Sequence, residues 1–368
     1  MAVESTARMR IPETMRAWAL FGPGDLRPVR KPVPRPGPAE VLVKIEAVAI
    51  CGTDLEILRK GLPAMIEGGS PFNGEHVIGH EYVGTVAALG PAVDEFDVGD
   101  RVVVEIHAGC GRCERCRHGA YTSCLNYSYR AKGHRANGFT TDGGFAEYAV
   151  NHVNTVFPLP DHIPFDEATL VVTAGTSIYG LDVLGGLIAG ESLLVIGPGP
   201  IGLMTVACGK ALGAEVILAG TREARLRLGR ELGADHVVNV RDQPLVEAVR
   251  TLTPRGLGVD LVMECSGAPE AVNQAVHCAK RGGRICLAAF SNDLVALDAA
   301  HLVRNNLYLY GIRGEGHGAT KRGLALMAQG KISGRPFITH RFALDDLPRA
   351  IETFEKRIDD AIKVVVTP

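Results

Sequence analysis

The sequence predicts an α/β protein of two domains, one rich in β-strands and one built on a doubly wound parallel sheet. Its 368 residues suffice for about two domains at roughly 150 residues each. Before Pro164 the chain contains several strand-like runs, one of which (Val41–Ile50) alternates polar and apolar side chains, whereas beyond it short apolar runs alternate with longer helical patterns. Apolar strands separated by helices are typical of βαβ units and therefore of a parallel sheet.

The β-rich domain is expected over residues 1–164. The alternation from Val41 to Ile50 indicates a strand with one buried face. Two further strand-like runs, Glu81–Val86 and Arg101–Ile106, lie among glycines and prolines, as short strands of a partly closed sheet do.

The parallel-sheet domain is expected over residues 165–311. An amphipathic helix between Leu347 and Ile358 and a strand at Ile362–Val366 follow it. Because this last strand can return to the first domain, residues 312–368 are expected to complete that domain. The predicted strands of the parallel sheet are Ser192–Ile196, Glu215–Ala219, Leu261–Glu264, Arg284–Ala288 and Leu307–Tyr310.

Composition and charge exclude several classes of partner. The chain carries 39 basic and 41 acidic residues, so it has no basic field that would favour nucleic acid. Its one long uncharged stretch, Ser192–Gly209, is interrupted by glycines and prolines that would break a membrane-spanning helix. Met1–Thr14 lacks the apolar run of a secretory signal. We therefore expect a cytoplasmic protein with neither nucleic acid nor membrane as a partner.

Four of the nine cysteines follow the pattern C-x2-C-x2-C-x7-C. Four thiolates this close can close a tetrahedral shell around zinc, which predicts a structural ion. An iron–sulfur cluster also takes four cysteines, although its bacterial pattern ends with three residues and Cys-Pro. An unmetallated loop is the third possibility. The four residues are Cys110, Cys113, Cys116 and Cys124.

A second group of potential ligands lies at the ends of two predicted strands. Cys51-Gly52-Thr53-Asp54 follows the first strand, and Gly79-His80-Glu81 precedes the next. A cysteine, a histidine and a carboxylate form the ligand set of a catalytic zinc that keeps one position open. Each residue alone is more often packed in a core or exposed at a surface, so the prediction depends on their combination.

A glycine-rich turn of the form G-x-G-x-x-G follows the predicted strand at Leu193–Ile196 and precedes a helical pattern. In this context it indicates a dinucleotide-binding Rossmann domain, because the glycines permit a tight turn and close approach of the pyrophosphate to the helix N-terminus. The turn comprises Gly197, Pro198, Gly199, Pro200, Ile201 and Gly202.

Together with Gly143–Tyr148, these motifs occur in the order found in zinc-containing medium-chain alcohol dehydrogenases, and the chain resembles that family from about Met15 to Val366. Within it, the sequence is most similar to the polyol branch (sorbitol and butanediol dehydrogenases) and to threonine dehydrogenases. The resemblance implies a GroES-like catalytic domain beside the Rossmann domain. It also implies hydride transfer between a secondary alcohol, a polyol or sugar derivative, and NAD(P)⁺, which gives the ketone.

The resemblance assigns roles to the second ligand group. Cys51 and His80 would bind the catalytic zinc, Asp54 would hold the His80 ring, and Thr53 would take the alcohol proton; a threonine at a strand end can equally be a structural residue. Thr173 stands where the family usually has a third ligand, and because its hydroxyl is a poor one, we expect Glu81 to ligate zinc instead. With the structural ion, this makes two Zn²⁺ per chain.

A further departure from the family is Glu56, which replaces a histidine that relays the proton to solvent in many relatives. A carboxylate can do so, although with a lower intrinsic pKa.

The resemblance also implies positions around the cofactor. Ser177 would contact the nicotinamide and Arg225 the adenosine ribose, while Lys363 would lie near the phosphates. Two later segments would line the nicotinamide: Ala288, Ala289 and Phe290, and Gly311, Ile312 and Arg313.

The residues after the second parallel strand favour NADP over NAD. An NAD site normally has an acidic residue there, whereas this chain has Gly220-Thr221-Arg222, in which Thr221 and Arg222 can bond a 2′-phosphate. The alternative is that Arg222 is only solvated and that NAD is accepted through Arg225.

Other points stay open at the level of sequence. The stretch Lys60–Glu75 is expected to form a wall of the substrate cleft, and relatives are homodimers or homotetramers. An amino-alcohol dehydrogenase acting on threonine-like substrates is an alternative activity. A non-catalytic zinc- and nucleotide-binding relative is another, with Thr173 and Glu56 as marks of lost activity.

Overall fold

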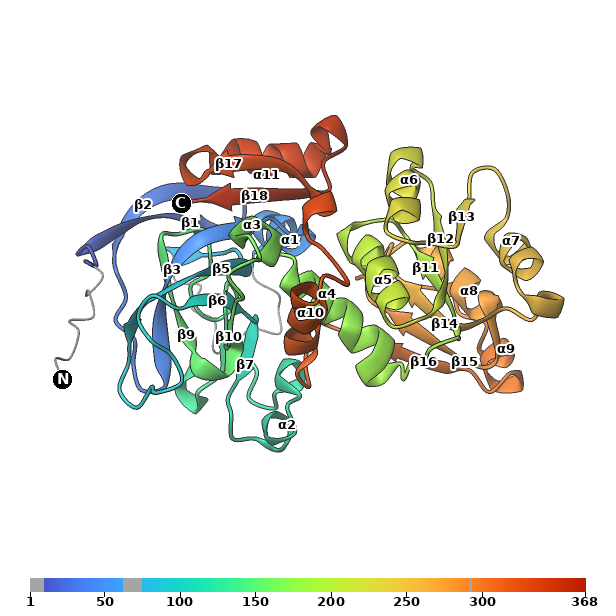
Figure 1. Cartoon of the computed structure of the whole chain (residues 1–368), viewed down its shortest axis with the longest axis horizontal. Coiled ribbons are helices and arrows are strands. Elements are labelled where there is room, and N and C mark those ends of the chain that lie inside the picture. Colours follow the sequence, from blue (N-terminus) through green and yellow to red (C-terminus); the bar gives the residue numbers. More distant parts are fainter. Residues whose placement is uncertain (1–9, 62–74, 291–292) are drawn as a thin grey trace. The chain divides into compact units, whose positions relative to one another are not determined.

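The computed structural model describes residues 10–61, 75–290 and 293–368, and it divides into two compact units (Figure 1). The first unit comprises Met1–Val172 and Phe337–Pro368, and the second comprises Thr173–Pro336. The expected substrate-cleft segment Lys60–Glu75 falls mostly outside the described residues. None of the helices in the described part of the chain is long and apolar enough to cross a membrane.

The core of the first unit is a seven-stranded sheet in the order β10-β6-β5-β3-β18-β17, with β9 paired to β3. A three-stranded sheet (β2-β1-β4) and a β7-β8 pair lie beside it. The strands are β1 Thr14–Gly22, β2 Asp25–Pro32, β3 Glu40–Ala49, β4 His76–Val77, β5 Glu81–Leu89, β6 Arg101–Val104, β7 His107–Gly109, β8 Arg135–Ala136, β9 Tyr148–His152, β10 Val156–Pro158, β17 Ile338–Ala343 and β18 Lys363–Thr367. The helices are α1 Gly52–Lys60, α2 Glu114–Arg117, α3 Phe165–Ala168 and α11 Leu347–Lys356.

The end of the chain returns to this first unit, where β18 pairs antiparallel with β3 and parallel with β17. Helix α11 supports it and buries Leu347, Ala350 and Ile351, the apolar face that the sequence predicts. In Figure 1 these C-terminal elements lie beside the N-terminal strands of the same unit.

The boundaries between the units differ from those that the sequence predicts. Residues 165–172 belong to the first unit and residues 312–336 to the second, so the return begins at Phe337 rather than at residue 312. The reason is helix α10 (Ala319–Ala328), which packs against helix α4 (Val171–Ile178). A Cβ on Gly323 would lie only 3.0 Å from the Cβ of Ala174, so the two helices touch closely.

The second unit contains a six-stranded parallel sheet in the order β13-β12-β11-β14-β15-β16. This order confirms the doubly wound prediction and places the switch point between β11 and β14. Its central strands are apolar because both faces of the sheet are buried. The strands are β11 Ser192–Ile196, β12 Glu215–Gly220, β13 His236–Asn239, β14 Val259–Glu264, β15 Ala279–Leu287 and β16 Tyr308–Gly311. The other helices are α5 Pro200–Ala211, α6 Glu223–Glu231, α7 Leu245–Leu252, α8 Pro269–Cys278 and α9 Ala299–Arg304.

Candidate metal centres and cofactor site

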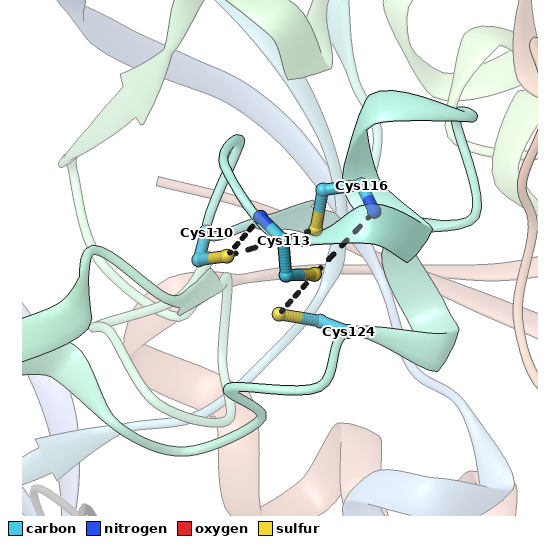
Figure 2. Close-up of side chains that lie close together, drawn as sticks. All are labelled: Cys110, Cys113, Cys116 and Cys124. Atoms are coloured by element: carbon cyan, nitrogen blue, oxygen red, sulfur yellow. Dashed lines mark hydrogen bonds between the residues drawn. The ribbon is translucent and has the colours of Figure 1, made fainter.

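The four clustered cysteines converge on one point of the loop between β7 and β8 (Figure 2). The Sγ atoms of Cys110 and Cys116 lie 3.9 Å apart, as do those of Cys113 and Cys124. A zinc tetrahedron with Zn–S bonds of about 2.3 Å has sulfur–sulfur edges of about 3.8 Å. The thiols therefore fit a closed four-sulfur zinc shell.

Hydrogen bonds to sulfur prepare this loop for thiolates. Cys110 Sγ accepts from the Cys113 backbone at 3.4 Å and from the Asn126 side chain at 3.3 Å. Burial opposes ionisation of Cys110, but these bonds outweigh it and lower the pKa of the thiol to about 6. Burial raises the pKa of the Cys116 and Cys124 thiols. All four can ionise together only if a cation compensates their charge, as a zinc ion would.

The second group of ligands is assembled by the register of two strands. β3 and β5 pair so that Ala49 faces Glu81, which brings Cys51, just beyond β3, beside His80 and Glu81. One ligand atom from each of Cys51, His80 and Glu81 lies within 4.8 Å of the others. His80 and Glu81 are buried, whereas Cys51 is half-buried. The backbone pairing of β3 with β5 thus fixes the three potential zinc ligands next to one another.

Asp54 orients this centre from the first turn of α1. It is buried, its Oδ1 lies 3.0 Å from His80 Nδ1, and its Oδ2 accepts the Cys51 N–H at 2.8 Å. Burial opposes protonation of His80, but the Asp54 carboxylate outweighs it and raises the pKa of the imidazole. With Nδ1 held by Asp54, Nε2 is the nitrogen left for a metal.

The remaining residues predicted for this centre lie on α1. Thr53 Oγ1 is 3.8 Å from Cys51 Sγ, so its hydroxyl is next to a ligand. Glu56 instead pairs with Lys60 at 3.3 Å, and its side chain is 39% exposed. The arrangement brings Thr53 to the centre and leaves Glu56 at the solvent side of the helix.

Lys363 contacts the candidate ligands of the second centre. It is fully buried in β18, and its ammonium bonds the Glu81 carboxylate. Burial opposes the charge, but Glu81 and Cys51 outweigh it and raise the pKa of Lys363. An ammonium removed from water requires a carboxylate partner, and Glu81 provides it. Lys363 thus lies beside the candidate metal ligands, and its position near the cofactor phosphates stays a prediction.

The glycine-rich turn of the second unit has the predicted strand–turn–helix form. Gly197 has φ +99°, and a Cβ there would lie 2.8 Å from Ser266. A Cβ on Gly202 would lie 2.0 Å from the Gly197 carbonyl oxygen, so only glycine allows this approach of helix to strand. Helix α5 begins at Pro200 with Gly199 as its N-cap, and its exposed N–H groups suit a pyrophosphate.

A buried carboxylate that the sequence analysis missed supports this turn. Glu264 ends β14, opposite Ile196 of β11, and accepts the N–H groups of Ser266 at 2.7 Å and Gly267 at 3.2 Å. It thereby fixes Ser266 against Gly197. The signal was present as an acidic residue at the carboxyl end of an otherwise apolar strand.

Two predicted cofactor residues already have protein partners. The guanidinium of Arg225 is buried and donates towards the Pro198 carbonyl at 3.5 Å, so it backs the glycine turn. The buried hydroxyl of Ser177 donates to the Thr173 carbonyl and accepts from Thr205, both at 3.1 Å. Thr173 is itself buried.

The two later segments follow neighbouring strands. The Ala288 N–H donates to the Glu264 carbonyl at 2.9 Å, and the Ile312 N–H donates to the Leu287 carbonyl at 3.0 Å. Both segments therefore leave the same carboxyl edge of the sheet as the glycine turn, where Rossmann domains bind ligands. Phe290 is 62% exposed at this edge.

The end of β12 also explains why no acidic residue is present there. A Cβ on Gly220 would lie 2.4 Å from Pro198 Cδ, so a side chain would collide with the glycine turn. Thr221 is exposed, and Arg222 is the half-buried N-cap of α6. Both polar side chains lie next to the turn that would hold the pyrophosphate.

Comparison with known proteins shows the family to which the chain belongs. Residues 37–161 match the alcohol dehydrogenase GroES-like domain, and residues 200–329 match the zinc-binding dehydrogenase family. The chain is 32% identical to sorbitol dehydrogenase of Bacillus subtilis, over 97% of this chain and 98% of that protein. It is 39% identical to L-threonine 3-dehydrogenase of Pyrococcus furiosus, over 84% of this chain and 86% of that protein.

Among solved structures, a zinc-binding dehydrogenase of Sinorhizobium meliloti bound to NADP superposes with a TM-score of 0.86 at 30% identity, covering 97% of this chain and all of the other. The chain belongs to the zinc-binding alcohol dehydrogenase family and is a zinc-dependent alcohol oxidoreductase that uses a nicotinamide cofactor. The interpretation of a non-catalytic relative is thereby set aside.

Proposed function

We propose that this dehydrogenase oxidises a secondary alcohol, a polyol or sugar derivative, to the ketone with NADP⁺. The alcohol carbon gives a hydride to the nicotinamide and the hydroxyl gives a proton, so the products are ketone, NADPH and H⁺. The observation that carries the proposal is the buried group of Cys51, His80 and Glu81 with Asp54 on the second nitrogen of His80. That donor set is the one that catalytic zinc sites use.

Side chains of the first unit would hold the metal, orient its ligands and transfer the proton. Zinc, when bound, supplies Lewis-acid activation of the alcohol, and the nicotinamide supplies the hydride acceptor. Cys51 and His80 hold the metal, and Asp54 fixes the tautomer and direction of His80. Thr53, next to Cys51, takes the proton from the alcohol hydroxyl. Glu56, at the solvent side of α1, can accept that proton on its way to water.

We assign the third protein ligand to Glu81. Its carboxylate belongs to the same 4.8 Å group as Cys51 and His80, and the neutral hydroxyl of Thr173 is a poor ligand. Lys363 bonds one Glu81 oxygen, Oε2, so Oε1 would be available to hold a metal ion. Together with the four-sulfur loop, this gives two zinc ions per chain.

The cofactor preference for NADP follows from the end of β12. The collision of any Gly220 side chain with Pro198 keeps an acidic residue away from the ribose. Thr221 and Arg222 then offer a hydroxyl and a guanidinium to a 2′-phosphate. The NADP bound to the Sinorhizobium relative supports this choice. Ser177 would reach the nicotinamide once its internal hydrogen bonds to Thr173 and Thr205 give way.

A threonine-like amino alcohol is the alternative substrate, since the identity to the Pyrococcus threonine dehydrogenase is 39%. The sorbitol dehydrogenase similarity extends over more of the chain, at 97%. Initial rates with sorbitol, ribitol, butane-2,3-diol and L-threonine, each with NAD⁺ and NADP⁺, decide between them. We expect the highest kcat/KM for a polyol with NADP⁺. A higher value for L-threonine would overturn the substrate assignment.

We also propose that the enzyme is a cytoplasmic homodimer or homotetramer. Nine cysteines, none of them in a disulfide, suit a reducing compartment. Strand β16 is an edge of its sheet, where Tyr308 is 66% exposed and Leu309 is 37% exposed, and such an apolar edge favours pairing with a second copy. Light scattering of the wild type and of Leu309→Lys tests this, with a smaller species expected for the variant and an unchanged one refuting the role of β16.

A further inference from the structure

A third group of metal-ligating side chains lies in the second unit, apart from the residues assigned to either zinc ion. It consists of His277, Asp298 and His301. We propose that these three side chains form a separate binding site for a divalent transition-metal ion, and that zinc is the preferred ion. The proposal is independent of the substrate and cofactor assignments.

The distance between two of the potential ligand atoms matches that of a metal shell. His277 Nε2 and Asp298 Oδ2 are 3.5 Å apart, longer than an ordinary hydrogen bond of about 2.7–3.2 Å. In a zinc tetrahedron with bonds of about 2.0–2.2 Å, neighbouring nitrogen and oxygen ligands are about 3.4 Å apart. The His301 ligand atom lies within 4.8 Å of the other two, and the two imidazole rings are 4.3 Å apart. Small side-chain rotations would close the shell.

The backbone around the group is already held in place. His277 lies in the last turn of α8, and Asn273, one turn earlier, accepts the Asp298 N–H at 2.9 Å. Asp298 is the N-cap of α9, and its Oδ1 accepts the His301 N–H at 2.9 Å. The cap occupies Oδ1 and leaves Oδ2 directed at His277. Binding therefore requires little ordering of the chain, which favours affinity.

The charges around the group favour one cation of moderate affinity. The charged and titratable groups that face His301 are His277, Asp298 and Arg250. His277 lies at a helix C-terminus, where the dipole favours positive charge. Asp298 offsets part of the ionic charge, whereas Arg250 opposes it.

Two imidazoles and one carboxylate are a donor set that zinc accepts with one position left for water. All three side chains are partly exposed, so an ion can enter from solvent. A bound ion would link the end of α8 to the start of α9. It would therefore stabilise the second unit in proportion to the free zinc concentration.

The test titrates zinc into the holoenzyme after both tight sites are filled, with calorimetry and metal analysis as readouts. We expect the wild type to bind one further zinc ion per chain. His277→Gln and His301→Gln should each weaken that binding at least about tenfold, since losing even a supporting residue costs this much. Asp298→Asn should weaken it as well, although its amide oxygen can still cap α9.

His236→Gln is the matched control, because His236 pairs with a single carboxylate, Glu215, at 3.4 Å in the same unit. It should bind the further ion as the wild type does. Retention of the two tight zinc ions shows that each variant is folded. The proposal is overturned if the wild type takes up no further ion at micromolar free zinc, or if His277→Gln and His301→Gln bind it unchanged.

Discussion

The two candidate zinc centres of the first unit differ in how their ligands are held. The four-cysteine loop is local in sequence, with all ligands between Cys110 and Cys124, and its sulfurs receive hydrogen bonds from the same loop. The second centre joins Cys51 and His80 through the pairing of two strands, and its supporting groups are ionisable: Asp54 and Lys363.

This difference indicates which centre performs the chemistry. A shell of four sulfurs has no place for substrate, so its binding energy contributes to folding. A shell of Cys51, His80 and Glu81 would leave a position open, and the buried charges around these residues would fix the ligands before substrate arrives. We therefore expect loss of the first ion to affect stability and loss of the second to affect turnover.

The largest effect is expected for Cys113→Ala. Structural zinc contributes about 10–16 kcal/mol to the folding of zinc-finger peptides, so loss of the ion should lower the unfolding free energy by several kcal/mol. Metal analysis should show one zinc fewer, and protein that stays folded should keep its kcat. Cys208→Ala, at a buried cysteine of α5, should keep all zinc. Full stability of Cys113→Ala would refute the structural role.

The second largest effect is expected for Glu81→Ala, because this change removes a potential zinc ligand and leaves Lys363 without its partner. Breaking a buried pair costs about 3–5 kcal/mol, and turnover should fall at least about 100-fold. The double variant Glu81→Ala/Lys363→Met should regain the unfolding free energy but not the turnover. If the double variant also regained turnover, Glu81 would be only the partner of Lys363.

These two centres also show what sequence can and cannot predict. The cysteine loop, the glycine turn and most of the parallel strands depend on residues close together in the chain, and the structure has them near the predicted positions. Strand β13, His236–Asn239, is not among the predicted strands, and β15 begins at Ala279 rather than at Arg284. The Glu81–Lys363 pair joins residues 282 positions apart, and no local pattern contains it. The boundary at Phe337 depends on the packing of α10 against α4, which is likewise a tertiary contact.

Asp54→Asn tests how far the second centre relies on charge. The amide can still accept the Cys51 N–H, but it no longer provides the negative charge at His80 Nδ1. Removal of such a supporting partner commonly costs about 10–100-fold in metal affinity or activity. Zinc competition with a chelator and kcat/KM measure it. Unchanged values for both would mean that Cys51 and His80 need no orienting group.

The smallest effect is expected in the second unit, from Arg222→Ala. Loss of one charge-assisted hydrogen bond of about 1.5–3 kcal/mol should raise the KM for NADP⁺ about tenfold or more and leave that for NAD⁺ unchanged. Arg227→Ala, an exposed arginine on the same helix, is the control. Equal KM values for NADP⁺ in Arg222→Ala and the wild type would remove Arg222 from the phosphate site.

The separation of the two zinc roles is tested most directly by graded removal of metal from the wild type with a chelator. Zinc per chain, turnover and the unfolding temperature are measured on the same samples. We predict that the first equivalent lost abolishes turnover while the unfolding temperature changes little, and that the second equivalent lowers the unfolding temperature sharply. Full turnover with one zinc ion per chain, or loss of stability before loss of turnover, would contradict this account.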